Sequence, residues 1–527
     1  MTAPVAPGGS AAGSEGTEDA LAGQEAPAAG QGAPVAGHEA LAEALAGVLG
    51  TGPVTGLRRL SGGASRETWA FEAGGRPLIL QRERPARVPR VGMAIETALL
   101  RAARERDVPV PAVVAADADA GGGPLGRAWM VVERIDGETI ARRILRDDAY
   151  AAARPRLAAQ CGDALARIHA IDPAAVPGLA GGDQIAQIRE ALDAVGEPHP
   201  VFELGFRWLE RHRPPGEAAQ AVVHGDFRNG NLVVGPEGLR AVLDWELAHL
   251  GDPLEDLGWL CVRAWRFGAE PRVGGFGPVD ELVGAYEATA GVTVDRAALR
   301  WWEVLGTLKW GIICVVQAST HLGGLVRSVE LAAIGRRVCE VEHDLLLLLP
   351  GGAARSTAVG PAAVPSAAVR RAAGPPPATR PSPPGPDDAA AQVAGRPGSP
   401  HDAPTAGQLV EAVREFLEGD VMATAEGRVR FHARVAARVL ATVERELAAG
   451  DGPARAQAAR LAALGFATDD ELAAAVRSGS LDDRWDEVAS AVRATVADKL
   501  AVANPTYAAG APAPSPPPGP PDDSPGR

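Results

Sequence analysis

Apolar residues recur at helical spacing over several parts of the chain, and short apolar runs stand between these parts. The runs at 60–71, 77–82 and 128–133 predict β-strands, and a glycine turn divides the first run into two. Elsewhere, spacings of three and four between apolar residues predict helices. The helices expected from this pattern cover Glu39–Leu49, Met93–Arg104, Pro155–Ile171, Leu257–Arg266, Asp280–Ala290, Ala297–Ser319 and Ser328–Leu349.

Two further apolar runs near the middle of the chain predict a β-hairpin. They are Leu232–Val234 and Leu239–Leu243, and Pro236, Glu237 and Gly238 separate them. Proline and glycine between two apolar runs are typical of a tight turn. A hairpin is rigid, so it can hold side chains at its ends in fixed positions.

Three polar residues flank this hairpin. Asp226 and Asn231 lie in the loop before it, and Asp244 lies at the end of its second strand. Phosphoryl transfer needs such a set, because one carboxylate must accept or orient a hydroxyl proton, while an amide oxygen and a second carboxylate hold Mg²⁺. Residues of these types also serve as helix caps and turn residues. Three of them in this spacing, with apolar strands between, favour the catalytic interpretation.

The spacing agrees with a known catalytic loop. Asp226 and Asn231 match the D-x-x-x-x-N pattern of protein kinases, and Asp244-Trp245-Glu246 stands where those enzymes carry Asp-Phe-Gly. The segments HGDFRNGN, LDWE and GDPLEDLGW resemble the aminoglycoside phosphotransferase-like family, also called choline-kinase-like, and particularly its branch fused in animals to acyl-CoA dehydrogenases.

The resemblance implies an α+β fold with the two lobes of a protein kinase. The domain would cover about residues 39–350, with an N-terminal lobe to about residue 133 and a C-terminal lobe from about residue 134. It also implies ATP as donor, Mg²⁺ as cofactor and a small-molecule hydroxyl as acceptor. Asp226 would then be the base, and Asn231 and Asp244 the metal ligands.

Nucleotide-binding residues are expected from the same resemblance. The segment GGASRETW, with Gly62, Gly63 and Ser65, would cover ATP, since glycines allow a close backbone approach to phosphate. Glu96 matches the family's ion-pairing glutamate, although a solvated helical glutamate is the alternative. Backbone groups near Glu133 would read adenine.

The expected third strand departs from the family. It would end in a basic residue that contacts phosphate, but Gln81 occupies that place and Arg82 follows it. Strand side chains alternate between faces, so these two cannot both point into the cleft. We favour Gln81 on the cleft side, because it then shares a face with Ile79. A nucleotide-binding pseudokinase that acts as a scaffold for the C-terminal helices is therefore the alternative function.

The acceptor is left open between two classes. An amino sugar would favour an acidic pocket, whereas hydroxyacyl-CoA would favour arginines at the pocket mouth. Glu246, Arg263 and Arg266 are the candidate substrate residues, and the two arginines favour the second class.

Composition restricts the partners and the compartment. The formal net charge of −14 argues against nucleic-acid binding, which needs a basic face. No lysine or arginine precedes Arg58, and no apolar run reaches membrane-spanning length, so we expect a cytoplasmic protein without a membrane partner. The four cysteines lie in predicted helices without metal-ligand spacing, which favours buried thiols. Oligomeric state is left open.

The rest of the chain is expected to form separate parts. Residues 1–38, 351–404 and 508–527 are rich in Pro, Ala and Gly, and we expect them to be a disordered start, a linker and a disordered tail. Residues 405–507 show helical periodicity and resemble an uncharacterised helical domain found beside such phosphotransferases. We expect a separate small bundle, so that a cut in the linker would leave two folded pieces.

Overall fold

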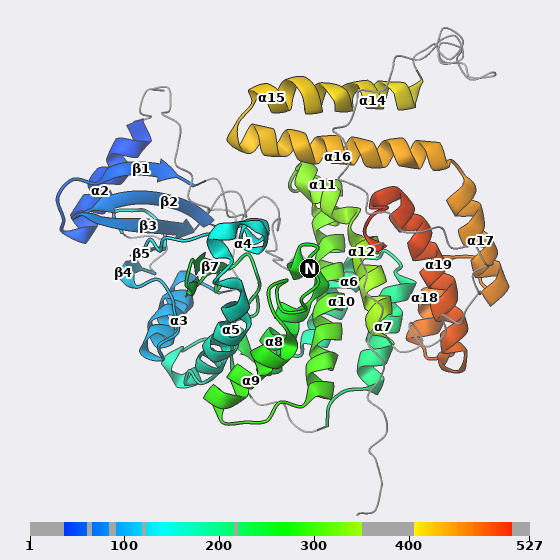
Figure 1. The fold of residues 1–527 in the computed structure, drawn as a ribbon, viewed down its shortest axis with the longest axis horizontal. Helices are drawn as coiled ribbons and strands as arrows, with labels where there is room; N and C mark the ends of the chain where they lie inside the picture. The colour runs from blue at the N-terminus through cyan, green and yellow to red at the C-terminus, as the bar shows by residue number, and fades with distance from the viewer. Residues whose placement is uncertain are drawn as a thin grey trace, which may run out of the picture.

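The computed structural model describes residues 36–60, 66–83, 91–118, 123–215, 220–349 and 405–508. Expectations for the linker and for most of the two termini lie outside these residues. The ribbon has a small sheet-containing lobe, a larger helical lobe and a set of C-terminal helices (Figure 1). Kinase-like phosphotransferases have this arrangement of two lobes, so the expected α+β fold is confirmed.

A five-stranded antiparallel sheet forms the N-terminal lobe, with strand order β1-β2-β3-β5-β4. Helix α2 (Ala36–Leu49) packs on one face of it and helix α3 (Met93–Glu105) on the other. The strands are β1 Thr55–Arg59, β2 Arg66–Ala73, β3 Arg76–Glu83, β4 Val113–Asp117 and β5 Trp129–Glu133.

The alternation of side chains in β2 and β3 decides what each face contains. Trp69 and Phe71 of β2 and Leu80 of β3 pack with α2 in one apolar cluster. Ile79 instead packs on the cluster that includes α3. Because directly paired residues of an antiparallel sheet point to the same side, Gln81 and its partner Thr68 lie on the α3 face together with Ile79.

The C-terminal lobe packs helices around two short strand pairs. β6 pairs with β9, and β7 pairs with β8. Strands and helices of this lobe are α4 Ala141–Arg146, α5 Arg154–His169, α6 Gln184–Val195, α7 Pro200–Arg211, β6 Ala221–Val223, β7 Leu232–Gly235, β8 Gly238–Val242, β9 His249–Gly251, α8 Leu254–Cys261, α9 Val279–Ala290, α10 Arg296–Leu322, α11 Val329–Gly335 and α12 Val338–Leu348. Short 3-10 turns stand at Asp148–Tyr150 (η1), Pro173–Ala175 (η2) and Arg263–Arg266 (η3).

The expected hairpin is present as β7 and β8, joined through Pro236 and Glu237. We expected one helix over Ser328–Leu349, and this prediction is wrong. The chain turns at Arg336 and Arg337, so two helices, α11 and α12, cover this range. All four cysteines are buried and free, in α5, α8, α10 and α12.

The C-terminal helices pack directly on the larger lobe. They are α14 Ala406–Phe416, a π-helical turn at Leu417–Val421 (η4), α15 Met422–Thr424, α16 Gly427–Ala449, α17 Gly452–Leu464, α18 Asp469–Arg477, a 3-10 turn at Asp482–Arg484 (η5) and α19 Trp485–Ala503. Helix α18 lies on α7, and α19 lies on α12 (Figure 1).

One hydrophobic cluster spans this contact. Its members from the larger lobe include Phe202, Phe206, Leu308 and Leu345, and those from the C-terminal helices include Leu461, Leu464, Leu472, Val476, Val488, Val492, Val496 and Leu500. The C-terminal helices, which we expected as a separate bundle, therefore share part of their core with the larger lobe. Helix α19 packs against α16 and α17 of the C-terminal set and also against α12 of the larger lobe.

Polar contacts surround this shared cluster. Arg207 on α7 forms an ion pair with Asp482 at 2.6 Å, and Lys499 on α19 forms one with the buried Glu342 at 3.0 Å. A buried carboxylate without a partner would be costly, so Lys499 makes the burial of Glu342 tolerable.

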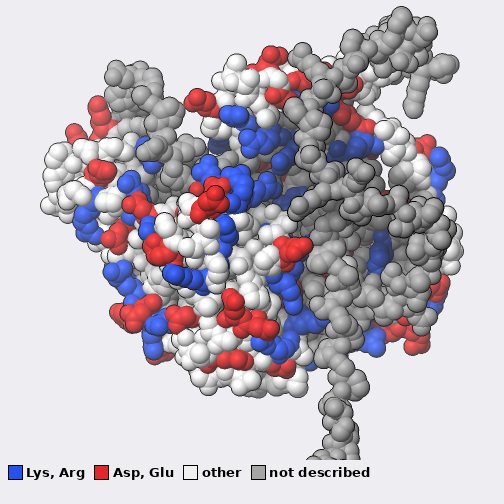
Figure 2. All heavy atoms as spheres, in the orientation of Figure 1, with Lys and Arg blue, Asp and Glu red and all other residues white. Residues whose placement is uncertain are grey.

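Charged side chains of both signs cover the face drawn in Figure 2, and basic residues gather near its middle, around α4. Helix α4 itself carries three arginines within six residues. Among the described residues, no helix is both long and apolar enough to cross a membrane.

The shared cluster predicts that the larger lobe and the C-terminal helices unfold together. Leu472→Ala on α18 should lower the free energy of unfolding by about 2–5 kcal/mol, because this nearly inaccessible side chain would leave a cavity. Differential scanning calorimetry should show one transition that moves as a whole. Leu409→Ala on α14, where the side chain is exposed, is the matched control and should change little. Two separate transitions, of which only one moves, would contradict the shared core.

Candidate active site

The loop between β6 and β7, residues 224–231, is anchored by one buried carboxylate. Asp256 in α8 accepts the backbone N–H of His224 at 2.8 Å and that of Gly225 at 2.9 Å. Gly225 has φ +79°, and a Cβ there would collide with the carbonyl of Leu247, so no larger residue fits. This anchoring sets the direction in which the 224–231 loop leaves the strand.

Asp256 is held in turn by His169 at the end of α5, 3.1 Å away, and His169 also contacts the Tyr286 hydroxyl at 3.0 Å. Burial works against ionisation of Asp256, but the contacts with His169 and His224 outweigh it and lower its pKa. Asp256 lies within α8. Asp252 closes the turn before this helix, accepting the N–H of Leu254 at 2.8 Å.

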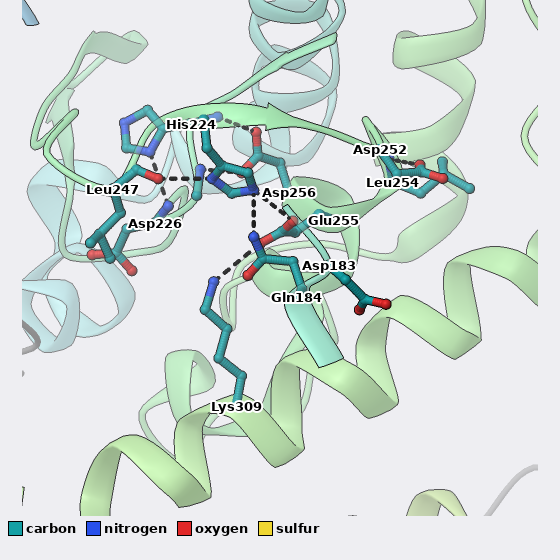
Figure 3. A network of polar contacts seen from close by, with 12 residues as sticks. Asp183, Gln184, His224, Asp226, Leu247, Asp252, Leu254, Glu255, Asp256 and Lys309 are labelled. Atoms are coloured by element: carbon teal, nitrogen blue, oxygen red, sulfur yellow. Dashed lines mark hydrogen bonds and ion pairs between the residues drawn. The ribbon is translucent and has the colours of Figure 1, made fainter. Parts of the chain in front are cut away.

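Figure 3 shows that this network continues behind the loop. Lys309 reaches in from α10 and contacts Glu255 at 3.1 Å, and Glu255 also contacts His249 at 3.0 Å. Lys309 is thus paired inside the lobe. Gln184 completes the network through His249 at 3.0 Å.

His224 is buried and links the loop to the end of β8. Its Nδ1 accepts the N–H of Asp226 at 3.2 Å, and its Nε2 donates to the carbonyl of Leu243 at 3.0 Å. Both contacts suit the neutral Nε2–H tautomer, and burial lowers the pKa of the imidazole. The ring also packs against Trp245, with centroids 4.7 Å apart. His224 therefore positions the two segments that carry the acidic residues.

Three donors hold the carboxylate of Asp226. Trp259 Nε1 donates to Oδ1 at 2.9 Å, Asn231 Nδ2 donates to Oδ2 at 2.7 Å, and Arg228 Nε lies 3.2 Å from Oδ1. Arg228 also stacks on Trp265, its guanidinium carbon 4.7 Å from the ring centroid. The carboxylate thus has a fixed orientation in the site.

Sequence reasoning missed Trp259 and Arg228. Arg228 stands two residues after Asp226 in the same loop, and this closeness was the available signal. Trp259 is buried, but its indole N–H points to the carboxylate, a direction that sequence alone does not contain.

Asn231 and Asp244 lie beside Asp226. The two hydrogen bonds described for the Asn231 side chain both come from Nδ2 and both reach Asp226, which leaves Oδ1 as the atom for a cation. The carbonyl of Asn231 accepts the N–H of Leu243 at 2.8 Å, so loop and strand end are joined directly.

Asp244 has unusual backbone geometry and strong electrostatics. Its φ is +65°, a left-handed conformation that non-glycine residues adopt rarely and at a cost. Asp244 is exposed, yet the surrounding protein disfavours its charge, and the like charges of Glu246, Asp226 and Glu96 add to this effect. Together they raise its pKa well above the usual value. Such an excess of negative charge favours a bound cation.

The oxygen donors present suit Mg²⁺. Among the described residues no group of three or more His, Cys, Asp or Glu is arranged to hold a metal. Asn231 and Asp244 would supply two oxygen ligands, and Mg²⁺ usually keeps waters and takes phosphate oxygens for the remainder. The donor set therefore fits this ion.

Some of the residues expected to bind the nucleotide lie outside the described residues, and the others have partners in the N-terminal lobe. Gly62, Gly63 and Ser65 lie outside the described residues. Glu96 on α3 is buried and forms an ion pair with Arg66, the first residue of β2, so its alternative as a solvated glutamate is wrong.

Arg82 and two of the backbone groups near Glu133 have partners within the N-terminal lobe. Arg82 lies on the α2 face of the sheet and pairs with Glu67 at 2.6 Å. The N–H groups of Glu133 and Arg134 donate to the carbonyls of Ala112 and Pro77, so these two groups are not available to adenine. By contrast, Gln81 lies on the α3 face and accepts from Arg66 at 3.3 Å.

The two arginines proposed for the acceptor are engaged elsewhere. Arg263 pairs with the buried Asp344 at 3.5 Å and stacks on Tyr507, whose hydroxyl donates to Asp344 at 2.6 Å. Burial raises the pKa of Asp344 to about 7. Arg263 thus belongs to the contact with the C-terminal helices.

Arg266 is half-buried and donates to the carbonyl of Cys261 at 2.7 Å, with the carboxylate of Glu303 at 3.2 Å. Both contacts hold its side chain against the larger lobe. Glu246 lies near the acidic residues of the site, because its charge raises the pKa of Asp244.

Comparison with known proteins agrees with this site. Residues 56–302 match the model of the phosphotransferase enzyme family, and residues 423–507 match a family described as a domain of unknown function. Mouse acyl-CoA dehydrogenase family member 10 is 28% identical over 257 residues, which are 45% of this chain and 23% of that protein. Chicken acyl-CoA dehydrogenase family member 11 is 29% identical over 224 residues, 38% of this chain and 27% of that protein.

The chain thus matches about a quarter of the length of these curated relatives. Among solved structures, a putative aminoglycoside phosphotransferase from Ralstonia eutropha is similar, with a TM-score of 0.48 and 21% identity, covering 57% of this chain and 96% of that one. A choline/ethanolamine kinase family protein from Mesorhizobium loti has a TM-score of 0.41 and 23% identity, covering 58% of this chain and 92% of that one.

The matched segment 56–302 contains the anchored loop, the hairpin and the acidic residues described above. A small-molecule kinase needs each of these parts. The chain therefore carries a domain of the phosphotransferase enzyme family, joined to a C-terminal helical region of unknown function.

Proposed function

We propose that this protein is an ATP- and Mg²⁺-dependent O-phosphotransferase that acts on a hydroxyl group of a small molecule. The observation that carries the proposal is the carboxylate of Asp226, held by Trp259, Arg228 and Asn231 beside the acidic residue Asp244. Phosphoryl transfer depends mainly on positioning and on charge stabilisation, and these contacts supply both.

Asp226 would orient the acceptor hydroxyl and receive its proton. Its three donors stop the carboxylate from rotating, so the hydroxyl would meet an oxygen in a defined direction. Arg228 brings a positive charge to the same place, and its stacking on Trp265 limits its movement. These residues thus prepare the acceptor side of the reaction.

Asn231 and Asp244 would hold Mg²⁺. When bound, this ion offsets the negative charge of the nucleotide's phosphates. The support for this assignment is the Oδ1 atom of Asn231 and the negative charge around Asp244. Glu246 adds to that charge, so we assign it to the metal region in preference to the acceptor pocket.

The acceptor stays open between hydroxyacyl-CoA and an amino sugar. Arg263 and Arg266 no longer favour the first class, because both have partners inside the protein. Two relatives are named as acyl-CoA dehydrogenase family members, and for this reason hydroxyacyl-CoA belongs in a first screen. Phosphate transfer from ATP should be measured across hydroxyacyl-CoAs, amino sugars and amino alcohols, with and without Mg²⁺. Failure of every class to accept phosphate would favour the pseudokinase alternative.

Asp226→Asn should reduce phosphate transfer by about 10²–10⁴-fold, because the amide cannot receive the hydroxyl proton. ATP binding, measured by calorimetry, should stay close to wild type, since Asp226 acts on the acceptor. Glu237→Gln in the exposed hairpin turn is the matched control and should retain turnover. A turnover within a few-fold of wild type in Asp226→Asn would remove Asp226 from this role.

Asp244→Asn should weaken ATP binding in the presence of Mg²⁺ more than in its absence. Asparagine tolerates φ near +65° but lacks the charge that attracts the ion. The folded-state pKa of Asp244 is raised, so its ionised form opposes folding at neutral pH, and the variant's melting temperature without ligand should not fall. Titration calorimetry with and without Mg²⁺ measures the first effect and thermal unfolding the second. An equal loss of both affinities would make Asp244 a structural residue.

A further inference from the structure

Arg66 occupies an unusual place for a cation in this fold. It is the first described residue after the segment that contains Gly62, Gly63 and Ser65, and it begins β2. Its side chain crosses to α3 and forms a buried ion pair with Glu96. The acidic partner expected on α3 is therefore matched by a cation, but this cation comes from β2 and not from β3.

The register of the sheet explains why the cation can come from β2 and not from β3. β2 and β3 are antiparallel, with Thr68 opposite Gln81 and Arg66 opposite Glu83, so Arg66 lies one side-chain step from Gln81 on the same face. Gln81 accepts a hydrogen bond from Nη1 of Arg66 at 3.3 Å. An amide accepts this bond without charge repulsion, which a lysine at the same position would introduce. Glutamine on β3 and arginine on β2 are thus complementary.

The environment keeps Arg66 positively charged at the junction of the two lobes. Burial alone would lower its pKa, but the carboxylates of Glu96, Glu246 and Asp244 outweigh this effect and raise it. Asp244 and Glu246 both follow β8 in the larger lobe, and Asp244 is one of the two proposed metal ligands. Arg66 therefore faces the region where Mg²⁺ and phosphates would lie.

The guanidinium group also has donors to spare. Nε and Nη2 of Arg66 are buried, and neither has a hydrogen-bond partner among the described residues. These two N–H groups form one edge of the planar fork, the edge that binds two oxygens of a phosphate side by side. Buried donors are nearly always satisfied, so such an edge indicates a ligand with acceptor oxygens.

We propose that Arg66 binds the phosphate oxygens of the nucleotide through this free edge, and that it replaces the basic residue expected at Gln81. The inference rests on the proposed function, because it takes ATP as the ligand of the cleft. Glu96 and Gln81 hold Nη1 and so orient the fork, while Nε and Nη2 point to the ligand. The cation of this phosphotransferase is thus supplied by the strand that leaves the glycine-containing segment.

The first test measures nucleotide binding, so it needs no knowledge of the acceptor. Arg66→Met keeps the length of the side chain and removes the charge. It should weaken binding of ATP and ADP roughly 10- to 100-fold, the equivalent of one or two charged hydrogen bonds. Adenosine, which has no phosphate, should bind as it does to wild type. Arg82→Met, on the opposite face of the sheet, is the matched control and should leave all three affinities unchanged.

A relocated cation provides the second test. Adding Gln81→Lys to Arg66→Met places a positive charge back beside Glu96, now from β3. This double variant should recover most of the lost ATP affinity, which a merely structural role of Arg66 would not predict. Arg66→Lys retains the charge near Glu96 without the planar edge, and it should weaken ATP several-fold while thermal unfolding stays unchanged. If Arg66→Met does not fold, the ATP affinity of Arg66→Lys tests the proposal in its place.

The outcomes separate this inference from the proposed function. If wild type binds ATP and both Arg66 variants bind it equally well, Arg66 is not a phosphate ligand, although the proposed function stands. Equal losses for ATP and adenosine would make Arg66 a structural residue. If wild type binds no nucleotide, both ideas are wrong. Reduced ATP binding with adenosine unchanged, and recovery by Gln81→Lys, would support the inference even without a known acceptor.

Discussion

The carboxylate of Asp256 is the contact on which the rest of the site depends. It is buried, and its oxygens accept the backbone N–H groups that begin the 224–231 loop. An anion without partners at such depth would be very costly, so His169 and these N–H groups must stay in place for the lobe to remain folded. The geometry of the loop is thus coupled to the stability of the lobe.

Beyond this anchor, short hydrogen bonds hold the acidic side chains of the loop and of the β8 end in place. His224 joins the loop to the end of β8, so Asp226 and Asp244 keep a constant relation to each other. Trp259 and Arg228 then orient Asp226. Loss of hydration raises the pKa of Asp244, and repulsion from the carboxylates gathered around it raises this pKa further. The site therefore favours positive charge, which a bound ion and Arg66 would supply.

The C-terminal helices complete the larger lobe. Their apolar faces share a cluster with α7, α10 and α12, and Tyr507 reaches Asp344 beside Arg263. Arg263 belongs to η3, which follows α8 directly, and α8 carries Asp256 and Trp259. The helical region therefore supports elements that position Asp226, although it contributes no residue to the acidic group.

The sequence by itself determined the local elements and the identity of the acidic group. Apolar runs around Pro236 specify a hairpin, and the spacing of Asp226, Asn231 and Asp244 indicated the chemistry, because turns and short spacings are local properties of the chain. Only the tertiary structure decided the partners of the buried charges. Whether Arg66 or Arg82 provides the cation depends on strand register and on the position of α3, and these are contacts between residues 15 or more apart in the chain. The docking of the C-terminal helices is of the same kind, because an apolar helix face shows that it will be buried but not against which surface.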